Sequence, residues 1–254
     1  RDSYKPEYVN ENFDCFVIPL ADAFRENFVN ELNELTSFVK KLKIPCYVIG
    51  VGLKESYEPD FSQPKPQDEA VKKFVTAVLE KSNCIGVRGE LTGKYLETLG
   101  FAEGRDFMVI GCPSMYMKGK RLHIQNPKLD VNSKVCFNSN VAASVPTRKF
   151  IKLKMKEFEN HYFIGQVVNE LRSIYLGAPY EYKIEYNFRN VTDKIYQDGR
   201  LRFFCNVPKW MEFLNDSDLT FGSRLHGNIA AVLAGTPALL VTKDSRTREL
   251  AEYH

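Results

Sequence analysis

Short apolar runs alternate with longer amphipathic stretches along most of this chain. The runs at 15–19 and 45–51 have the length and composition of buried strands. Between them, residues 24–43 carry apolar side chains at the three- and four-residue spacing of a helix. Strands and helices that alternate in this way build a parallel sheet with helices on both faces. The pattern predicts further elements in the order helix, strand, helix and strand, at 68–81, 83–87, 89–99 and 107–110.

The alternation stops at 117–132, a polar stretch that contains Pro127 and has no period. A second alternating series begins beyond it, so we place a domain boundary there. The segment 150–160 stays open between helix and strand, because part of it also alternates with a period of two. The strands expected in the second series are 134–137, 162–165, 201–205, 219–221 and 237–241, and the helices are 166–176, 207–215, 224–234 and 245–253.

We therefore predict an α/β fold with two Rossmann-like lobes, residues 1–117 and residues 118–254, each built on a parallel sheet. Two such lobes imply a cleft, and open α/β sheets bind ligands at the carboxyl ends of their strands. A chain of 254 residues is long enough for two cores. Because no run reaches 18 consecutive apolar residues, we expect no transmembrane segment and a cytoplasmic protein.

Composition excludes several classes of function. The chain has 35 lysine and arginine residues against 32 aspartate and glutamate residues, a balance that is not typical of nucleic-acid binding. The six cysteines are widely spaced and form no CxxC motif or Cys/His cluster, so we expect no metal site. Several cysteines lie inside apolar runs, which is typical of buried thiols in a reduced compartment.

The most informative segment is a turn from strand to helix at Gly222 and Ser223. The free N–H groups at the start of a helix bind anions, and Ser223 can cap the helix or donate its hydroxyl to an anion. Arg224 adds a guanidinium group that suits phosphate or carboxylate, and His226 can exchange protons near the same helix end. Gly227 lets a ligand or a neighbouring backbone approach closely. A structural histidine is the plainer alternative for His226.

Two further turns have the same design. Arg246 and Arg248 follow the next strand, and a second cationic turn at the same sheet edge suggests a ligand with more than one negative group. A solvated cluster of salt bridges is the alternative for both arginines. In the first lobe Arg88 lies where a strand ends and a helix begins, and its alternative role is a helix cap or an ion pair with Glu90.

Aromatic residues gather between 175 and 204, where sugars could stack on their faces. Core or loop anchoring is the more common role of such residues. The aromatic residues considered are Tyr180, Tyr182, Tyr186, Phe188 and Tyr196.

With these motifs the sequence resembles the polysaccharide pyruvyl transferase family. The similarity runs from about Phe13 to the C-terminus, with a weak middle between Met117 and Val207. Each motif is short, but their order and their strand–turn–helix context make the match specific. The motifs are IGVRGELT (85–92), GCPS (111–114), GSRLHG (222–227) and DSRTRE (244–249).

The resemblance implies a two-lobed fold like that of GT-B glycosyltransferases. It also implies transfer of a pyruvyl group from phosphoenolpyruvate to two hydroxyls of a sugar, which forms a cyclic ketal and releases phosphate. The acceptor is then a sugar or a lipid-linked oligosaccharide of polysaccharide or exopolysaccharide biosynthesis, so peripheral association with a membrane stays open. We expect residues 1–117 on the acceptor side and residues 118–254 on the donor side. No cofactor is expected beside the donor.

Within this scheme Arg224 is expected to hold the anions of the donor, and His226 to act as general acid or base. The resemblance points to the triplet Arg224-Leu225-His226, with Arg88 as the second candidate for donor binding. The further expected substrate contacts are Ser223, Gly227, Asn228, Arg246 and Arg248.

One departure from the family pattern concerns the N-terminus. Family members usually have a glycine-rich turn with Gly-Asp after their first strand, and nothing like it precedes Phe13. We therefore expect that strand and turn to lie before Arg1. Two other functions stay open. A GT-B glycosyltransferase would cradle the diphosphate of a nucleotide sugar in the same turns. A non-catalytic carbohydrate-binding protein is the other, and the intact Ser-Arg-x-His-Gly cluster argues against it.

Overall fold

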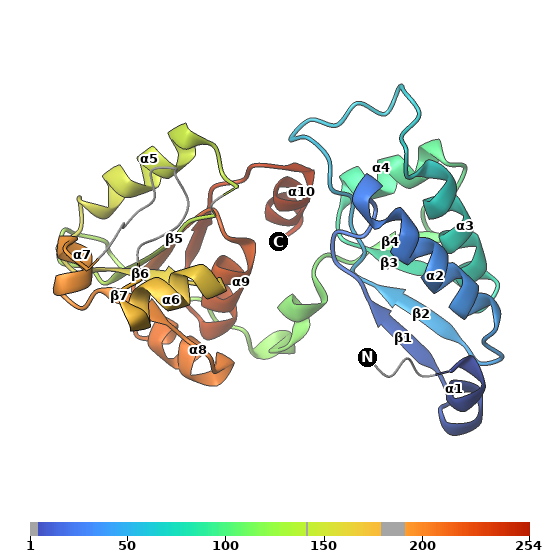
Figure 1. Ribbon diagram of the computed structural model, residues 1–254, viewed down its shortest axis with the longest axis horizontal. Coiled ribbons are helices and arrows are strands. Elements are labelled where there is room, and N and C mark those ends of the chain that lie inside the picture. Colours follow the sequence, from blue (N-terminus) through green and yellow to red (C-terminus); the bar gives the residue numbers. More distant parts are fainter. Residues whose placement is uncertain (1–4, 141, 179–190) are drawn as a thin grey trace. The chain divides into compact units, whose positions relative to one another are not determined.

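The computed structural model describes residues 5–140, 142–178 and 191–254 (Figure 1). The chain forms two compact units, which we call unit 1 (Arg1–Pro113 with Asp244–His254) and unit 2 (Ser114–Lys243). Both units are α/β, and the paired strands of the described residues run parallel, so the predicted α/β class with parallel sheets is confirmed.

The strands of unit 1 form two parallel pairs that follow one another in chain order. A parallel bridge between Val51 and Val87 links the second strand to the third. The side chains between the strands and the helices are apolar and closely packed, and Phe24, Phe74 and Phe107 are fully buried among them. The pairs are β1 (Phe16–Pro19) with β2 (Cys46–Ile49), and β3 (Ile85–Val87) with β4 (Phe107–Val109).

The helices of unit 1 largely follow the expected pattern. In α3 the residues at positions 71, 74, 75 and 78 are buried, which is one face of a helix, and α3 packs against α2. The chain leaves α4 through Gly100, whose φ of +94° is the left-handed conformation that glycine adopts without strain. A short helix near the N-terminus was not predicted. The helices are α1 (Pro6–Asn12), α2 (Val29–Lys40), α3 (Asp68–Leu79), α4 (Glu90–Thr98) and α10 (Ser245–Tyr253), with a 3₁₀ turn at Glu26–Phe28.

The last helix, α10, belongs to unit 1. The pattern of the sequence grouped it with residues 118–254, because it follows the last strand of the second series directly. Its contacts decide otherwise: Glu249 of α10 is buried and hydrogen-bonded to Thr92 at the start of α4. Asp244 closes the helix start by accepting a hydrogen bond from the backbone amide of Thr247.

Unit 2 is built on a parallel sheet with the strand order β7-β6-β5-β8-β9. The chain starts in the middle at β5, continues to one side and then returns to the other, so the order reverses between β5 and β8. Ligands of open α/β sheets bind at such a switch point, beyond the carboxyl ends of the strands. The strands are β5 (Val135–Asn138), β6 (His161–Gly165), β7 (Leu201–Phe203), β8 (Leu219–Gly222) and β9 (Ala238–Leu240).

The segment 150–160, which the sequence left open between helix and strand, is helical as far as Met155. Residues 145–155 are helical: Ser144 caps the helix by accepting a hydrogen bond from Thr147 N, while Ile151 and Met155 face the core. Two 3₁₀ turns precede β5: Pro113–Tyr116 comes before the polar stretch 117–132, and Gly119–Arg121 lies within it. The helices are α5 (Val145–Met155), α6 (Val168–Leu176), α7 (Lys194–Gln197), α8 (Val207–Asn215) and α9 (Leu225–Ala234), of which α7 was not predicted.

None of the helices in the described part of the chain combines the length and the apolar character that crossing a membrane requires.

Candidate functional site

The turn that follows β8 is anchored to the end of β5. Gly222 pairs with Asn138, and a Cβ atom at Gly222 would lie 1.9 Å from the carbonyl oxygen of Asn138, so only glycine fits this position. The Asn138 side-chain oxygen accepts a hydrogen bond from Arg224 N at 2.8 Å. The hydroxyl of Ser223 accepts one from the backbone amide of Asn140 at 2.9 Å. Both strand ends at the switch point are therefore joined by hydrogen bonds to two side chains, that of Ser223 from the predicted motif and that of Asn138, which was not predicted.

The guanidinium group of Arg224 is held in one orientation. Its Nε donates to the carbonyl oxygen of Ser139 at 2.6 Å, and its Nη2 donates to Glu170 at 2.7 Å. Glu170 is fully buried in the first turn of α6, where its carboxylate also accepts hydrogen bonds from the backbone amides of Gln166 and Val167. Burial raises the pKa of Glu170, while Arg224 and the two amides act in the opposite direction.

Sequence reasoning missed Glu170, which lies 54 positions before Arg224. The only local signal was a glutamate in the first turn of an expected helix, where an acidic residue is common without any further role. The pairing depends on β6 lying beside β5 in the sheet, which no local pattern shows.

The other predicted residues of this turn divide into buried supports and one accessible group. His226 lies in the first turn of α9 and is exposed. Leu225 and Asn228 are buried, and the Asn228 side chain donates to the carbonyl oxygen of Arg224 at 2.9 Å. A Cβ atom at Gly227 would lie 2.5 Å from the side-chain nitrogen of Gln166. His226 is therefore exposed at the start of a helix whose neighbouring residues are buried and hydrogen-bonded.

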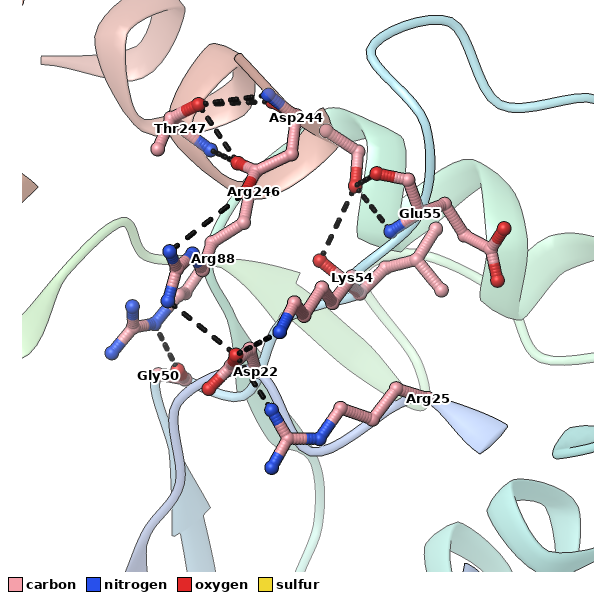
Figure 2. A network of polar contacts seen from close by, with 11 residues as sticks. Asp22, Arg25, Gly50, Lys54, Glu55, Arg88, Asp244, Arg246 and Thr247 are labelled. Carbon is pink, nitrogen blue, oxygen red and sulfur yellow. Dashed lines mark hydrogen bonds and ion pairs between the residues drawn. The ribbon is translucent and has the colours of Figure 1, made fainter. Parts of the chain in front are cut away.

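A second cluster of charged residues lies at the carboxyl ends of β1, β2 and β3 in unit 1 (Figure 2). At its centre the Asp22 carboxylate lies 2.9 Å from Arg25 Nη1, 3.4 Å from Arg246 Nη1 and 3.8 Å from Lys54 Nζ. Burial alone would raise the pKa of Asp22, but Arg246, its own backbone amide, Arg25 and Lys54 together hold that pKa below its usual value. We call these residues, together with Arg88, the arginine cluster.

Arg88 enters the arginine cluster directly after β3. Its Nε donates to the carbonyl oxygen of Gly50 at 2.6 Å, and only 6% of the residue is exposed. Burial lowers the pKa of Arg88, and Arg246 acts in the same direction, while Cys112, Asp22 and Glu249 act to raise it. The alternative of an ion pair with Glu90 is wrong for the described structure, in which Glu90 pairs with Lys94 at 3.8 Å. The structure thus brings together two predicted residues, Arg88 and Arg246, from distant parts of the chain.

Arg248, the third predicted arginine of unit 1, has a different environment. Its Nε donates to Glu252 at 2.8 Å, one turn further along α10, and its guanidinium group lies over the ring of Tyr57 at 5.1 Å. Arg248 thus forms the surface ion pair that was the alternative for this segment.

Glu249 is a functional candidate that sequence reasoning did not identify. It is buried between α10 and α4, and burial raises its pKa to about 7. A Cβ atom at Gly89 would lie 2.6 Å from the Cβ of Glu249, so glycine at this position allows α10 to approach. In the sequence Glu249 follows Arg248 in a charged segment, and such a segment is typical of a solvent-exposed helix face.

Other groups contribute less to a site. Within the described ranges, no three His, Cys, Asp or Glu side chains are grouped as a metal ion would require. The six cysteines are free thiols, and burial raises the pKa of Cys46 and Cys136 to about 11. Of the aromatic residues considered for sugar stacking, Tyr196 packs half-buried against the core of unit 2. The remaining four (Tyr180, Tyr182, Tyr186 and Phe188) lie outside the described residues.

The fold and its strand ends define an α/β protein with Rossmann-like parallel sheets and arginine-bearing turns from strand to helix. Residues 3–245 match the polysaccharide pyruvyl transferase family, so the chain belongs to that family and the resemblance is confirmed. The family indicates a transferase that acts in polysaccharide biosynthesis. A search of curated proteins found no match.

Proposed function

We propose that this protein transfers the pyruvyl group of phosphoenolpyruvate to two hydroxyls of a sugar, forming a cyclic ketal and releasing phosphate. The observation that carries the proposal is the turn after β8, where a fixed guanidinium group, that of Arg224, adjoins the first turn of α9 with the exposed His226. Membership of the pyruvyl transferase family supports the same reaction.

The chemistry places two demands on the site. The donor carries a phosphate and a carboxylate, so cationic groups and a helix N-terminus are needed to bind it. Its methylene carbon must gain a proton, which creates positive character at the neighbouring carbon, and a sugar hydroxyl forms a bond to that carbon. A second hydroxyl then bonds to the same carbon as the bond to the phosphate oxygen breaks, and the hydroxyl protons pass to a base.

The residues of the turn would divide these tasks. Arg224 binds a donor anion with the help of the amides that open α9, and His226 transfers protons as general acid or base. Ser223, Leu225 and Asn228 hold the backbone of the turn in place, as their burial and hydrogen bonds suggest. Gly227 gives the Gln166 and Asn138 side chains room to pack against the start of α9.

Unit 1 would contribute to substrate binding through Arg88 and Arg246. Arg248, on the same helix as Arg246, would be a further substrate contact. The acceptor in this proposal is a sugar or a lipid-linked oligosaccharide. We also propose a GT-B-like architecture, which the parallel sheets of both units support.

The direct test is phosphate release from phosphoenolpyruvate in the presence of a panel of sugars, with mass analysis of the products. The proposal requires phosphate release that depends on an acceptor, together with a sugar product that carries a ketal. Release without any modified sugar would contradict it.

The competing function is a glycosyltransferase that uses a nucleotide sugar, since helix N-termini at a switch point also bind diphosphates. Thermal unfolding separates the two functions. Saturating phosphoenolpyruvate should raise the melting temperature if it is the donor, because a ligand at about 100 times its Kd stabilises by about 2.7 kcal/mol. Protection by nucleotide sugars and not by phosphoenolpyruvate would favour the glycosyltransferase. Binding of a glycan without any turnover of phosphoenolpyruvate would favour a non-catalytic protein.

A further inference from the structure

Helix α5 of unit 2 (Figure 1) carries apolar residues on its exposed side as well as on its buried side. Ile151 and Met155 are buried in the core of unit 2. Leu153 stands two residues from each of them, which places it on the opposite side of the helix. There 59% of Leu153 is exposed, and Phe150, one turn earlier, is 45% exposed. Packing within unit 2 therefore explains only one of the two apolar sides.

The exposed side of α5 is also cationic. Residues 145–156 include five lysine and arginine residues and no aspartate or glutamate, although the net charge of the whole chain is only +3. Lys152 and Lys156 are exposed and lie one helical turn apart, and neither forms an ion pair with a residue that the structure describes. Lysines near the end of a helix stabilise its dipole, but this role does not explain why Leu153 and Phe150 are exposed beside them.

These four residues form one surface, which we call the α5 outer surface. Leu153 lies three positions from both Phe150 and Lys156, and Lys156 lies four positions from Lys152, so the side chains are neighbours along the helix. The surface thus combines apolar side chains with lysine side chains that are not neutralised by a neighbouring carboxylate.

An anionic membrane matches both parts of this surface. Apolar side chains of a helix that lies in the interface enter the region below the headgroups, and the long stems of lysine let the ammonium groups reach the lipid phosphates. A nucleic acid would match the lysines only, because its phosphate backbone offers no apolar surface for Leu153. The exposed leucine and phenylalanine therefore favour the membrane over a polyanion in water.

We propose that the α5 outer surface binds the protein to the surface of a membrane that contains anionic lipids. In this arrangement α5 lies in the plane of the interface, with Leu153 and Phe150 inserted between the lipids and with Lys152 and Lys156 at the phosphate groups. The binding is peripheral and reversible, since it uses a few side chains of one helix.

This inference goes beyond the proposed function and does not rest on it. The binding follows from the exposure and charge of α5, so it can be measured without turnover. A lipid-linked oligosaccharide acceptor would lie in such a membrane, and binding there would raise the concentration of the acceptor near the protein.

The experiment is sedimentation of the whole chain with vesicles, either of phosphatidylcholine alone or of equal parts of phosphatidylcholine and phosphatidylglycerol. We expect binding to the anionic vesicles and not to the neutral ones, and added salt should weaken it by screening the exposed charges. Lys152→Gln/Lys156→Gln should bind about tenfold more weakly or worse, since each lysine near an anionic membrane contributes about fivefold. Leu153→Asn should weaken binding by about fivefold, because less apolar surface leaves water.

Each variant has a matched control in unit 2. Lys194→Gln/Lys209→Gln changes the net charge by the same amount, at two exposed lysines of α7 and α8. Leu176→Asn removes a leucine of α6 that is 77% exposed. Both controls should bind anionic vesicles like the unmodified protein. Because all these side chains are exposed, the melting temperature should stay nearly unchanged in every variant.

Several results would overturn the proposal: no binding to either kind of vesicle, equal binding to both kinds, or equal weakening in a variant and its control. Weakening by the lysine substitutions without any effect of Leu153→Asn would also overturn it, because such binding needs no apolar insertion and fits any polyanion.

Activity on a soluble sugar separates this inference from the proposed function. Lys152→Gln/Lys156→Gln should keep that activity, since neither lysine belongs to the candidate site. Vesicle binding through α5 in a protein without transferase activity would leave the membrane surface standing and reject the proposed function. Transferase activity in a protein that does not bind anionic vesicles would do the reverse.

Discussion

Glu249 accepts hydrogen bonds from both the backbone amide and the hydroxyl of Thr92, at 3.0 and 2.9 Å, although the two residues are 157 positions apart in the chain. This contact attaches α10 to the start of α4. It therefore places Arg246, three residues before Glu249, beside Arg88, four residues before Thr92. The arginine cluster of unit 1 depends on this pairing between two segments that are far apart in the chain.

The pKa of Glu249 predicts a stability that depends on pH. Because its pKa rises from 4.5 to about 7 on folding, its contribution is fully present below about pH 4.5 and is lost as pH rises through 7. This loss amounts to roughly 3 kcal/mol between the two limits. Glu249→Gln keeps the shape without the titration, so its free energy of unfolding should fall less than that of the unmodified protein between pH 5 and pH 8. Urea denaturation at both pH values measures the difference, and equal pH dependence in the two proteins would contradict the prediction.

Removal of Glu170 should destabilise unit 2. Glu170→Ala leaves the Arg224 guanidinium without its buried carboxylate, and breaking a buried ion pair on one side typically costs about 3–5 kcal/mol. Chemical denaturation checks this value. The matched control is Glu157→Ala, which removes an exposed carboxylate 2.8 Å from Lys154 and should cost less than about 1 kcal/mol. Similar losses in both variants would show that Glu170 does not stabilise Arg224.

The proposed role of His226 predicts a loss of catalysis without a loss of stability. His226→Ala should lower kcat by about 10²–10⁴, the usual contribution of a general acid or base, and should leave the melting temperature nearly unchanged because the side chain is exposed. The control is His123→Ala, an exposed histidine of unit 2 outside the turn. Near-normal turnover in folded His226→Ala would rule out the role.

Two glycine substitutions separate steric from backbone effects. Gly222→Ala would place a methyl group 1.9 Å from the carbonyl oxygen of Asn138, so we expect a loss of about 3 kcal/mol or more, together with displacement of the turn. Gly199 has a φ of +63°, and a Cβ atom added there would meet nothing within 4 Å, so Gly199→Ala should cost only the backbone strain, about 1 kcal/mol. Thermal unfolding of both variants tests this order, and a smaller loss for Gly222→Ala would contradict it.

Much of the fold was predictable because its signals are local. The spacing of apolar residues in 68–81 predicts α3, and the alternation of strands and helices predicts parallel sheets. The segment 150–160, whose first half belongs to α5, was ambiguous because part of it alternates with a period of two. The helix is stabilised by the cap at Ser144 and by burial of Ile151, and this burial depends on the folded core.

The candidate site divides in the same way. The sequence by itself determined that Ser223, Arg224 and His226 open a helix after a strand, because neighbours in the chain stay neighbours in the turn. Only the tertiary structure decided that Glu170 holds Arg224 and that Arg246 meets Arg88. These contacts join segments that are distant in the chain, and they form because the sheet order and the packing of α10 on α4 bring the segments together. Long-range pairing of this kind has no periodic signature, so the residues that carry it look like ordinary surface charges until the chain is folded.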